Sequence, residues 1–260
     1  MYILRKNQRV EILQSPNLLV VINYQTNHGL IPTTTISLNR SEIFVHGSLF
    51  FPINTYLTTS GNSFNFGTGV FTAECWFYLT TNPATYKAFL IGAVSTGGFS
   101  LYTGSDATTS SAVSICIDCY LTGHTSFTVP TMTTGKWYHV AVSRDSSGYV
   151  SLWLNGVRSS TGRISNTYNF TSTKLNIGAW SVMTESSNGV YINDLRITNT
   201  NVYNTNNSSI TVPTSLLTSI SGTQLLLNTT HDMNYKTDNS VNKFTMNTNG
   251  IITISSLTPF

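Results

Sequence analysis

Charged residues are scarce in this chain of 260 residues: 9% are Asp, Glu, Lys or Arg, whereas about 25% is typical of soluble proteins. The formal net charge is +3. The longest basic run is the pair Arg5-Lys6, and a nucleic-acid-binding face requires a basic patch or stripe. We therefore expect no nucleic-acid partner. We also expect Thr, Ser and Asn side chains to make the surface polar enough to be solvated.

Long apolar runs are absent as well. The longest early run, LLVVI at residues 18–22, is far shorter than the ~18 apolar residues of a membrane-spanning helix. It is also shorter than the apolar core of a secretory signal peptide. The sequence therefore predicts no membrane insertion and no export by the general secretory route.

Cysteine is rare and odd in number, since only Cys75, Cys116 and Cys119 are present. Such a set does not form a disulfide framework. Cys116 and Cys119 have the C-x-x-C spacing of redox and zinc sites, but the sequence holds no second pair to complete four zinc ligands. Residues three apart on a strand also point to opposite faces. We expect buried thiols instead.

The chain does contain many short alternating runs, separated by Gly, Asn, Ser and Thr, and no sustained helical repeat. This pattern predicts an all-β protein. About a dozen strands need two packed sheets to bury their faces. The predicted strands span residues 48–53, 70–79, 87–94, 99–104, 112–121, 137–145, 149–156, 174–180, 190–198, 223–228, 243–248 and 251–256.

The stretch KWYHVAVSRDSSGYVSLWLNGV at residues 136–157 reads as a hairpin whose two strands meet at the polar turn DSSG. Asn155-Gly156 predicts a further tight turn, because this pair tolerates positive φ at both central positions. One apolar row from each strand should meet in the core: Tyr138, Val140 and Val142 with Val150, Leu152 and Leu154.

Residues 1–47 differ from the rest, because they carry Arg5, Lys6 and Arg9 among irregular polar runs without alternation. We interpret them as an N-terminal arm or small docking element, followed by a β-sandwich over residues 48–260. Residues 199–217 read as a long polar connection before the last strands.

Four motifs in residues 48–260 together resemble laminin G-like domains of the concanavalin A-like lectin/glucanase superfamily. They are F-G-x-G-x-F-T-x-E-x-W at 66–76, the hairpin at 136–157, LNIGAW at 175–180 and GVYINDLRIT at 189–198. The resemblance implies a two-sheet antiparallel jelly-roll sandwich. The chain departs from the family at Cys75, a small thiol at a packing position, and at Asn193 before Asp194, which weakens a paired-acid metal site.

The final stretch resembles the ending of laminin G-like modules in structural proteins of large tailed bacteriophages and other large DNA viruses. It holds LLL at 225–227, D-x-S-x-N-x-F at 238–244 and a terminal PF. This resemblance implies a virion structural protein, present in many copies or as a homo-oligomer, on the capsid or on a tail or fibre. It would assemble in the host cytoplasm and be released by lysis. Other virion proteins are the expected partners, and Arg5, Lys6 and Arg9 the candidate attachment residues.

Catalysis is not expected. Retaining glucanases need two carboxylates about 5–5.5 Å apart, but the two acids closest in this sequence, Asp232 and Asp238, are six residues apart. Glu74 could pair across strands with a distant acid, although a carboxylate satisfied by neighbouring backbone or hydroxyl groups is the simpler expectation. The five histidines lack metal-site spacing, and His139 should be packed against the sheet. The sequence predicts no catalytic residue and no cofactor.

Binding stays open. Sugar sites use exposed aromatic rings, and Trp180, Tyr168 and Tyr102 lie beside loops rich in Asn and Ser; core packing is the alternative for each ring. Members of the family often hold Ca²⁺ at a loop edge, so Asp194 and Asp145 are the candidate ligands. Because the ten acids of the chain are scattered, we predict no metal and keep calcium as the alternative.

The predicted function is a non-enzymatic virion surface protein with weak adhesion to glycans or the host surface. The alternative is a secreted or cell-surface carbohydrate-binding module that acts outside the cell. Five N-glycosylation sequons would suit that alternative, although they are expected by chance in so Asn- and Thr-rich a chain. They begin at Asn39, Asn169, Asn206, Asn207 and Asn228.

Overall fold

A computed structural model describes residues 47–59, 63–82, 88–94, 97–104, 110–118, 122–180, 189–228 and 237–260. The chain divides into two units, Met1–Glu42 and Ile43–Phe260. The candidate attachment residues Arg5, Lys6 and Arg9 lie outside the described residues, as does Cys119. In the described part of the chain, no helix is long and apolar enough to cross a membrane.

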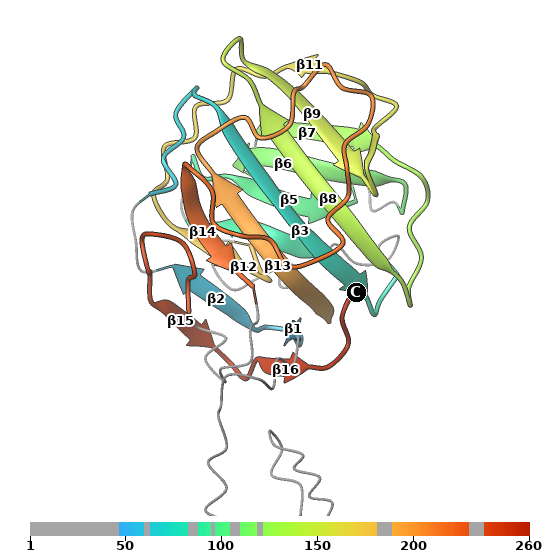
Figure 1. Cartoon of the computed structure of the whole chain (residues 1–260), viewed down its shortest axis with the longest axis vertical. Helices are drawn as coiled ribbons and strands as arrows, with labels where there is room; N and C mark the ends of the chain where they lie inside the picture. The colour runs from blue at the N-terminus through green and yellow to red at the C-terminus, as the bar shows by residue number, and fades with distance from the viewer. Residues whose placement is uncertain are drawn as a thin grey trace, which may run out of the picture. The chain divides into compact units, whose positions relative to one another are not determined.

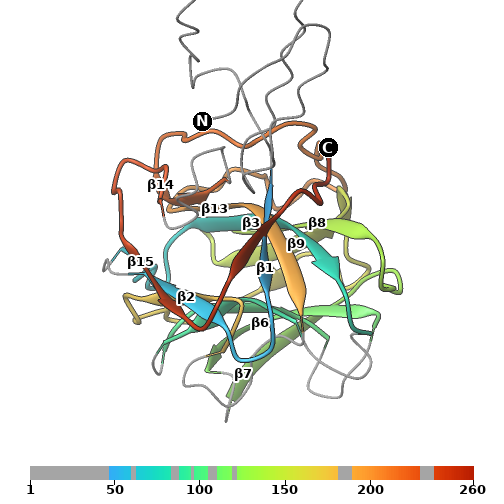
Figure 2. The same cartoon turned by 90° about the horizontal axis from the view of Figure 1, so that it is seen from below.

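The described residues form two antiparallel sheets that pack face to face (Figures 1 and 2). This arrangement confirms the predicted all-β sandwich, and the described residues contain no helix. The larger sheet has the order β10 (Val157–Arg158), β9 (Tyr149–Leu154), β8 (Trp137–Arg144), β3 (Phe71–Leu79), β13 (Val190–Thr198), β1 (Ser48–Phe51) and β16 (Thr253–Ser255), with β11 (Ile164–Ser165) on β9 and β14 (Thr223–Leu227) on β13.

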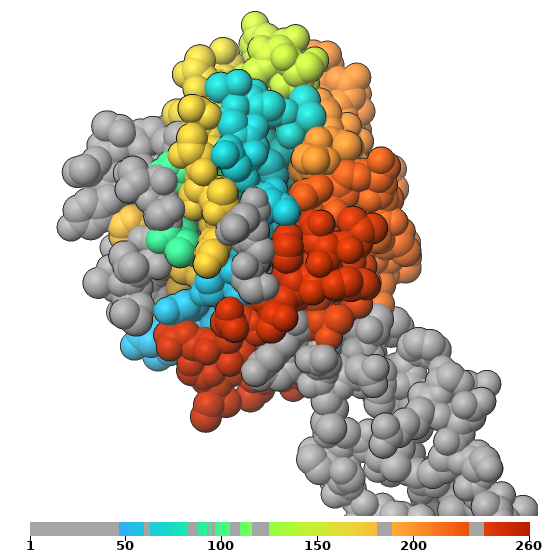
Figure 3. All heavy atoms as spheres, turned by 90° about the vertical axis from the view of Figure 1, so that its left-hand side faces the viewer, coloured from blue at the N-terminus to red at the C-terminus, as the bar shows by residue number. Residues whose placement is uncertain are grey.

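The smaller sheet has seven strands. Their order is β15 (Met246–Asn249), β2 (Tyr56–Thr59), β12 (Leu175–Ile177), β4 (Phe89–Ala93), β5 (Ser100–Thr103), β6 (Ala112–Asp118) and β7 (Thr122–Thr128). The last strands of the chain close both sheets beside the first ones, because β16 pairs with β1 and β15 pairs with β2. Figure 3 shows the second of these contacts, where the red end of the chain lies against the blue strand.

The core lies between the sheets and is built from alternate residues of each strand. The predicted hairpin is confirmed, since Val140 lies opposite Leu154 and Val142 lies opposite Leu152. The turn after it is confirmed too, because Asn155 and Gly156 have φ of 50° and 80°. Cys75 is a buried free thiol, as expected.

One cation, Arg144 of β8, is buried at the end of this core. Its guanidinium donates hydrogen bonds to the carbonyl oxygens of Gly69 (2.7 Å), Gly67 (2.7 Å) and Tyr168 (2.6 Å). It also lies over the rings of Phe71 and Phe170, at 5.1 and 5.0 Å from their centroids. Burial lowers the pKa of Arg144 to about 10, so the group stays charged at neutral pH and ties two loops to the sheet.

Candidate functional site

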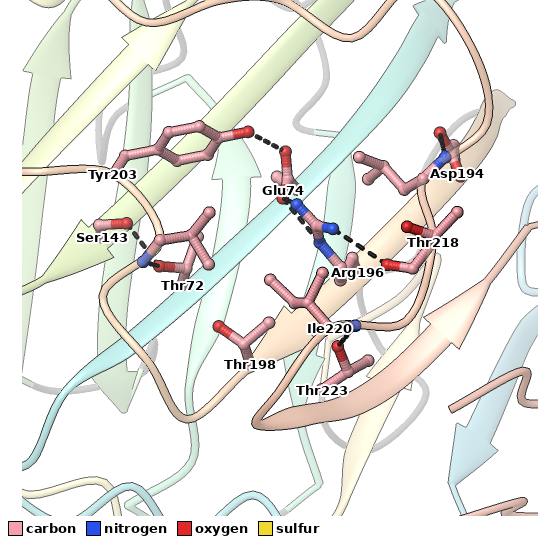
Figure 4. A network of polar contacts seen from close by, with 12 residues as sticks. Thr72, Glu74, Ser143, Asp194, Arg196, Thr198, Tyr203, Thr218, Ile220 and Thr223 are labelled. Atoms are coloured by element: carbon pink, nitrogen blue, oxygen red, sulfur yellow. Dashed lines mark hydrogen bonds and ion pairs between the residues drawn. The ribbon is translucent and has the colours of Figure 1, made fainter. Parts of the chain in front are cut away.

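The outer face of the larger sheet, which points away from the core, carries a layer of buried polar side chains (Figure 4). Thr72 and Glu74 come from β3, Ser143 from β8 and Arg196 from β13. These side chains are buried because residues 199–222, here called the covering segment, run across this face between β13 and β14 (Figure 1).

Glu74 lies at the centre of this layer and accepts hydrogen bonds at both carboxylate oxygens. Arg196 donates to Oε1 from Nε at 2.9 Å and from Nη2 at 2.5 Å, and the hydroxyl of Tyr203 donates to Oε2 at 2.6 Å. His139 Nε2 lies 3.4 Å from Oε2 without hydrogen-bond geometry. The carboxylate is satisfied by neighbouring groups: the hydroxyl of Tyr203 is of the expected kind, and the guanidinium of Arg196 is a partner that the sequence did not indicate.

The protonation of Glu74 follows from these contacts. Burial by itself raises the pKa of a carboxyl group, but here it is outweighed. The contact with His139, the charge of Arg196 and the Tyr203 hydroxyl together hold the pKa of Glu74 below its usual range. Glu74 is therefore an ionised carboxylate that is fully engaged by the protein itself.

Hydrogen bonds from the sheet to main-chain groups fix the covering segment in place. The hydroxyl of Ser151 donates to Thr205 O at 2.6 Å, and the indole of Trp153 donates to Asn207 O at 3.0 Å. Thr72 donates to Thr200 O at 2.9 Å. The polar connection that the sequence indicates is thus an ordered cover for the sheet.

Asp194 lies at a β-bulge in β13, where it adopts a left-handed φ of 56°. Its Oδ2 accepts the Leu217 N–H at 2.7 Å, while its buried Oδ1 has no partner. Burial is the main cause that raises the pKa of Asp194 to about 7, and the charge of Glu74 adds to it.

A protonated acid near an ionised one is the pattern that glycoside hydrolysis uses. Glu74 and Asp194 have this pattern, but both side chains have an exposed fraction of 0% beneath the covering segment. A sugar in solution has no access to either carboxyl group in this arrangement. The pair is therefore enclosed by the covering segment and is not placed to act on a substrate in this arrangement.

The second calcium candidate, Asp145, stabilises the turn after β8 through its hydrogen bonds. Its Oδ1 accepts the N–H groups of Ser147 and Tyr149, and its Oδ2 accepts hydrogen bonds from Arg163 (2.8 Å) and Thr205 (2.5 Å). Burial raises its pKa, but the bonds from Thr205, Arg163 and the two amides bring the pKa to about 2. Among the described residues, no three His, Cys, Asp or Glu gather as they would around a metal.

The structure brings together two of the three aromatic candidates. Tyr102 and Trp180 flank Phe89 on the outer face of the smaller sheet, with centroid distances of 5.2 and 6.4 Å to its ring. They are 1% and 7% exposed. Tyr168 lies apart from them, because its ring packs edge-on against Phe170 of the main core.

A row of four aromatic rings crosses the outer face of the larger sheet beyond the covering segment. Trp137, Tyr78, Tyr191 and Phe50 come from the adjacent strands β8, β3, β13 and β1 and lie opposite one another in register. Successive ring centroids are 5.6, 5.6 and 4.5 Å apart. All four side chains are half-buried. We call this set the aromatic row. No sequence motif indicates this set, because its members come from four separate strands.

Comparison with protein families matches residues 52–211, more than half of the chain, to a family of the concanavalin A-like lectin/glucanases superfamily. Among solved structures, a native heptameric SAP-like pentraxin from Limulus polyphemus is 11% identical, with a TM-score of 0.54 over 81% of this chain and 95% of that one. A protein from Bacteroides ovatus, proposed to bind carbohydrate, is 18% identical, with a TM-score of 0.58 over 82% of this chain. The chain spans 60% of that second protein. No curated protein sequence matches.

Proposed function

Because the chain belongs to the concanavalin A-like lectin/glucanase superfamily, we propose that it is a non-enzymatic recognition module that binds carbohydrate. The superfamily contains both lectins and glucanases, so the choice between them depends on the carboxylates. The observation that carries the proposal is the state of Glu74, whose two oxygens are bonded to Arg196 and Tyr203 beneath the covering segment. A catalytic carboxylate must reach its substrate, and this one is enclosed.

Two further observations support a binding role. The proposed carbohydrate-binding protein from Bacteroides ovatus shares the fold, with a TM-score of 0.58. The aromatic row also offers partly exposed rings, and the positions two residues before or after them hold no Asp, Glu, Lys or Arg, which suits an uncharged ligand. Single contacts of this kind are weak, and display in many copies would multiply them through avidity.

The test is a glycan array probed with the full chain, combined with an assay for newly released reducing ends on every glycan that is retained. The proposal predicts retention without release. Release of reducing ends by the wild-type chain that Glu74→Gln abolishes would overturn the non-enzymatic assignment. The absence of any retained glycan would overturn carbohydrate binding.

We also propose that the module is displayed on the surface of a virion, with residues 1–47 as the arm that attaches it through Arg5, Lys6 and Arg9. The resemblance of residues 223–260 to viral laminin G-like modules supports this role, together with the low charge of the chain. A secreted or cell-surface lectin is the competing assignment.

Deletion of residues 1–47 tests the display proposal. The truncated chain should keep its β circular dichroism but no longer sediment with particles of its source. The substitutions Arg5→Ala, Lys6→Ala and Arg9→Ala, combined in the full chain, should weaken sedimentation as well. Full retention of the truncated chain on particles would refute the arm, and glycans found on Asn169 or Asn206 would favour the secreted alternative.

A further inference from the structure

We infer that the aromatic row is the carbohydrate-binding surface, and that its ligand is a neutral polysaccharide chain lying across strands β8, β3, β13 and β1. This inference rests on the proposed function and names its site and ligand class. It assigns binding to Trp137, Tyr78, Tyr191 and Phe50, in place of the sequence-derived candidates Trp180, Tyr102 and Tyr168.

The shape of the row is the first argument. Four adjacent strands spaced about 4.8 Å apart place the outer rings about 14 Å from each other. The ring centroids follow one another without a break, at 5.6, 5.6 and 4.5 Å. The ring of Tyr78 is inclined by 62° to that of Trp137 and by 89° to that of Tyr191, so faces and edges alternate along the line. A line of this length matches an extended chain of several sugar rings, whose C–H groups pack on the aromatic rings while its hydroxyls remain in water.

The chemistry around the row is the second argument. The positions two residues before or after the row residues hold no Asp, Glu, Lys or Arg. They are Ser48, Pro52, Trp76, Thr80, Gly135, His139, Gly189 and Asn193. Tyrosine and tryptophan combine an apolar ring with one polar group. The row therefore offers stacking surface and neutral hydrogen-bonding groups, which complement an uncharged ligand and give nothing to an anionic one.

The area of the row argues against a protein partner. Aromatic side chains bury about 150–250 Å² each when fully covered, so four that are already mostly covered offer at most about 300 Å². A stable protein interface needs about 800 Å² on each side. The row also cannot widen toward the covering segment, because Phe260 packs edge-on against Trp76 there, at 6.2 Å between centroids; Figure 1 shows the chain end beside the tip of β3.

The test uses the full chain in native gels that contain a soluble β-glucan, a galactomannan, a starch-type α-glucan or, as the charged comparison, heparin. Tyr78→Thr and Trp137→Thr remove rings from the row, and threonine is a good strand former. Tyr56→Thr is the matched control, since Tyr56 is a half-buried strand tyrosine of the smaller sheet. Circular dichroism and the thermal midpoint establish that each variant is folded.

The inference predicts that at least one neutral polysaccharide retards the wild type, and that each row variant weakens this retardation about two- to tenfold, the factor expected for one stacked ring. Tyr56→Thr should bind like the wild type. Retardation that both folded row variants retain would refute the row while leaving the proposed function intact. Wild-type retardation by none of the polysaccharides would refute both, and retardation by heparin alone would refute the ligand class.

Self-association is the remaining rival for the row. Sedimentation of the wild type at rising concentration distinguishes it from sugar binding. The inference predicts the same mass for the wild type and for Tyr78→Thr. A wild-type dimer that Tyr78→Thr dissociates would make the row a contact between copies of this chain and overturn the inference.

Discussion

Among single residues, Arg144 is the one whose substitution should lower the free energy of unfolding most. Its removal would leave the part-buried carbonyl oxygens of Gly69 and Tyr168 without donors, whereas Gly67 O would keep the N–H of Phe170. Each carbonyl that loses its donor costs about 1–3 kcal/mol. We expect Arg144→Met to lower the free energy of unfolding by about 3 kcal/mol or more, measured in urea. Arg163→Met is the control, because that residue is 27% exposed in its salt bridge and should cost less than about 1 kcal/mol. Equal losses in the two variants would contradict this account.

Asp194 should make stability depend on pH. Its pKa is raised to about 7 in the folded protein, chiefly by burial, so folding favours the protonated acid. The stabilising contribution of the protonated Asp194 is therefore fully present below pH 4 and is lost as the pH rises toward 7. Asp194→Asn mimics the protonated form, so it should flatten this slope and raise the free energy of unfolding at pH 8.

Asp145→Asn is the comparison variant, and its effect on the free energy of unfolding should have the opposite sign. The pKa of Asp145 is lowered to about 2 by its hydrogen bonds, so its ionised form stabilises the fold above pH 4. The variant should therefore be less stable than the wild type at pH 8. If Asp194→Asn also lost stability at pH 8, its carboxyl group would have to be ionised and usefully paired in the folded state.

Among the elements, the covering segment depends on close approach to the turn after β9. A Cβ on Gly156 would lie 2.7 Å from Ile210 O and 2.8 Å from Val212 Cγ2, whereas one on Gly162 would meet nothing within 4 Å. The two glycines have nearly the same φ, 80° and 79°. Gly162→Ala should cost about 1 kcal/mol from backbone strain alone.

Gly156→Ala should cost clearly more, because the covering segment must also move away from the turn. Hydrogen exchange should then become faster in residues 199–212 of this variant and stay unchanged there in Gly162→Ala. Equal behaviour of the two variants would mean that the segment does not depend on this contact.

The sequence predicts the positions of the strands better than it predicts which side chains gather on the outer face of the larger sheet. Eleven of the twelve predicted strands contain an observed one and the twelfth, 243–248, overlaps β15, because alternation marks the faces that meet in the core. Four strands were missed: β2 is a four-residue run, β7 has one core residue in a polar sequence, and β10 and β11 have two residues each. Such strands form because a neighbour supplies hydrogen bonds, which local pattern does not reveal.

The polar layer could not be predicted, because the bulge in β13 reverses the alternation. Counting from Val190, strict alternation would turn Arg196 inward and Ile197 outward. The register shift between Asn193 and Arg196 turns Arg196 outward and Ile197 inward instead, so Arg196 contacts Glu74 on the outer face. The partners of Glu74 are also remote, at separations of 122 and 129 residues. The aromatic row depends on strand order in the same way, since its members lie at positions 137, 78, 191 and 50.

At the scale of the whole β unit, the two halves of the larger sheet's outer face have separate roles. The half beneath the covering segment encloses its charges and stabilises the fold. The other half leaves the aromatic row partly exposed, and we assign recognition to it. The polar layer and the aromatic row depend on the same strands β3, β8 and β13. The contacts beneath the covering segment therefore also hold the rings of the aromatic row in register.

Hydroxyl-radical footprinting of the full chain, with and without the neutral polysaccharide that retards it most, tests this division most directly. Mass spectrometry follows oxidation at each tryptophan and tyrosine. The account predicts that the polysaccharide protects Trp137, Tyr78 and Tyr191 and leaves Trp180, Tyr102 and Tyr203 unchanged. Protection confined to Trp180 and Tyr102, or no protection at any ring, would contradict it.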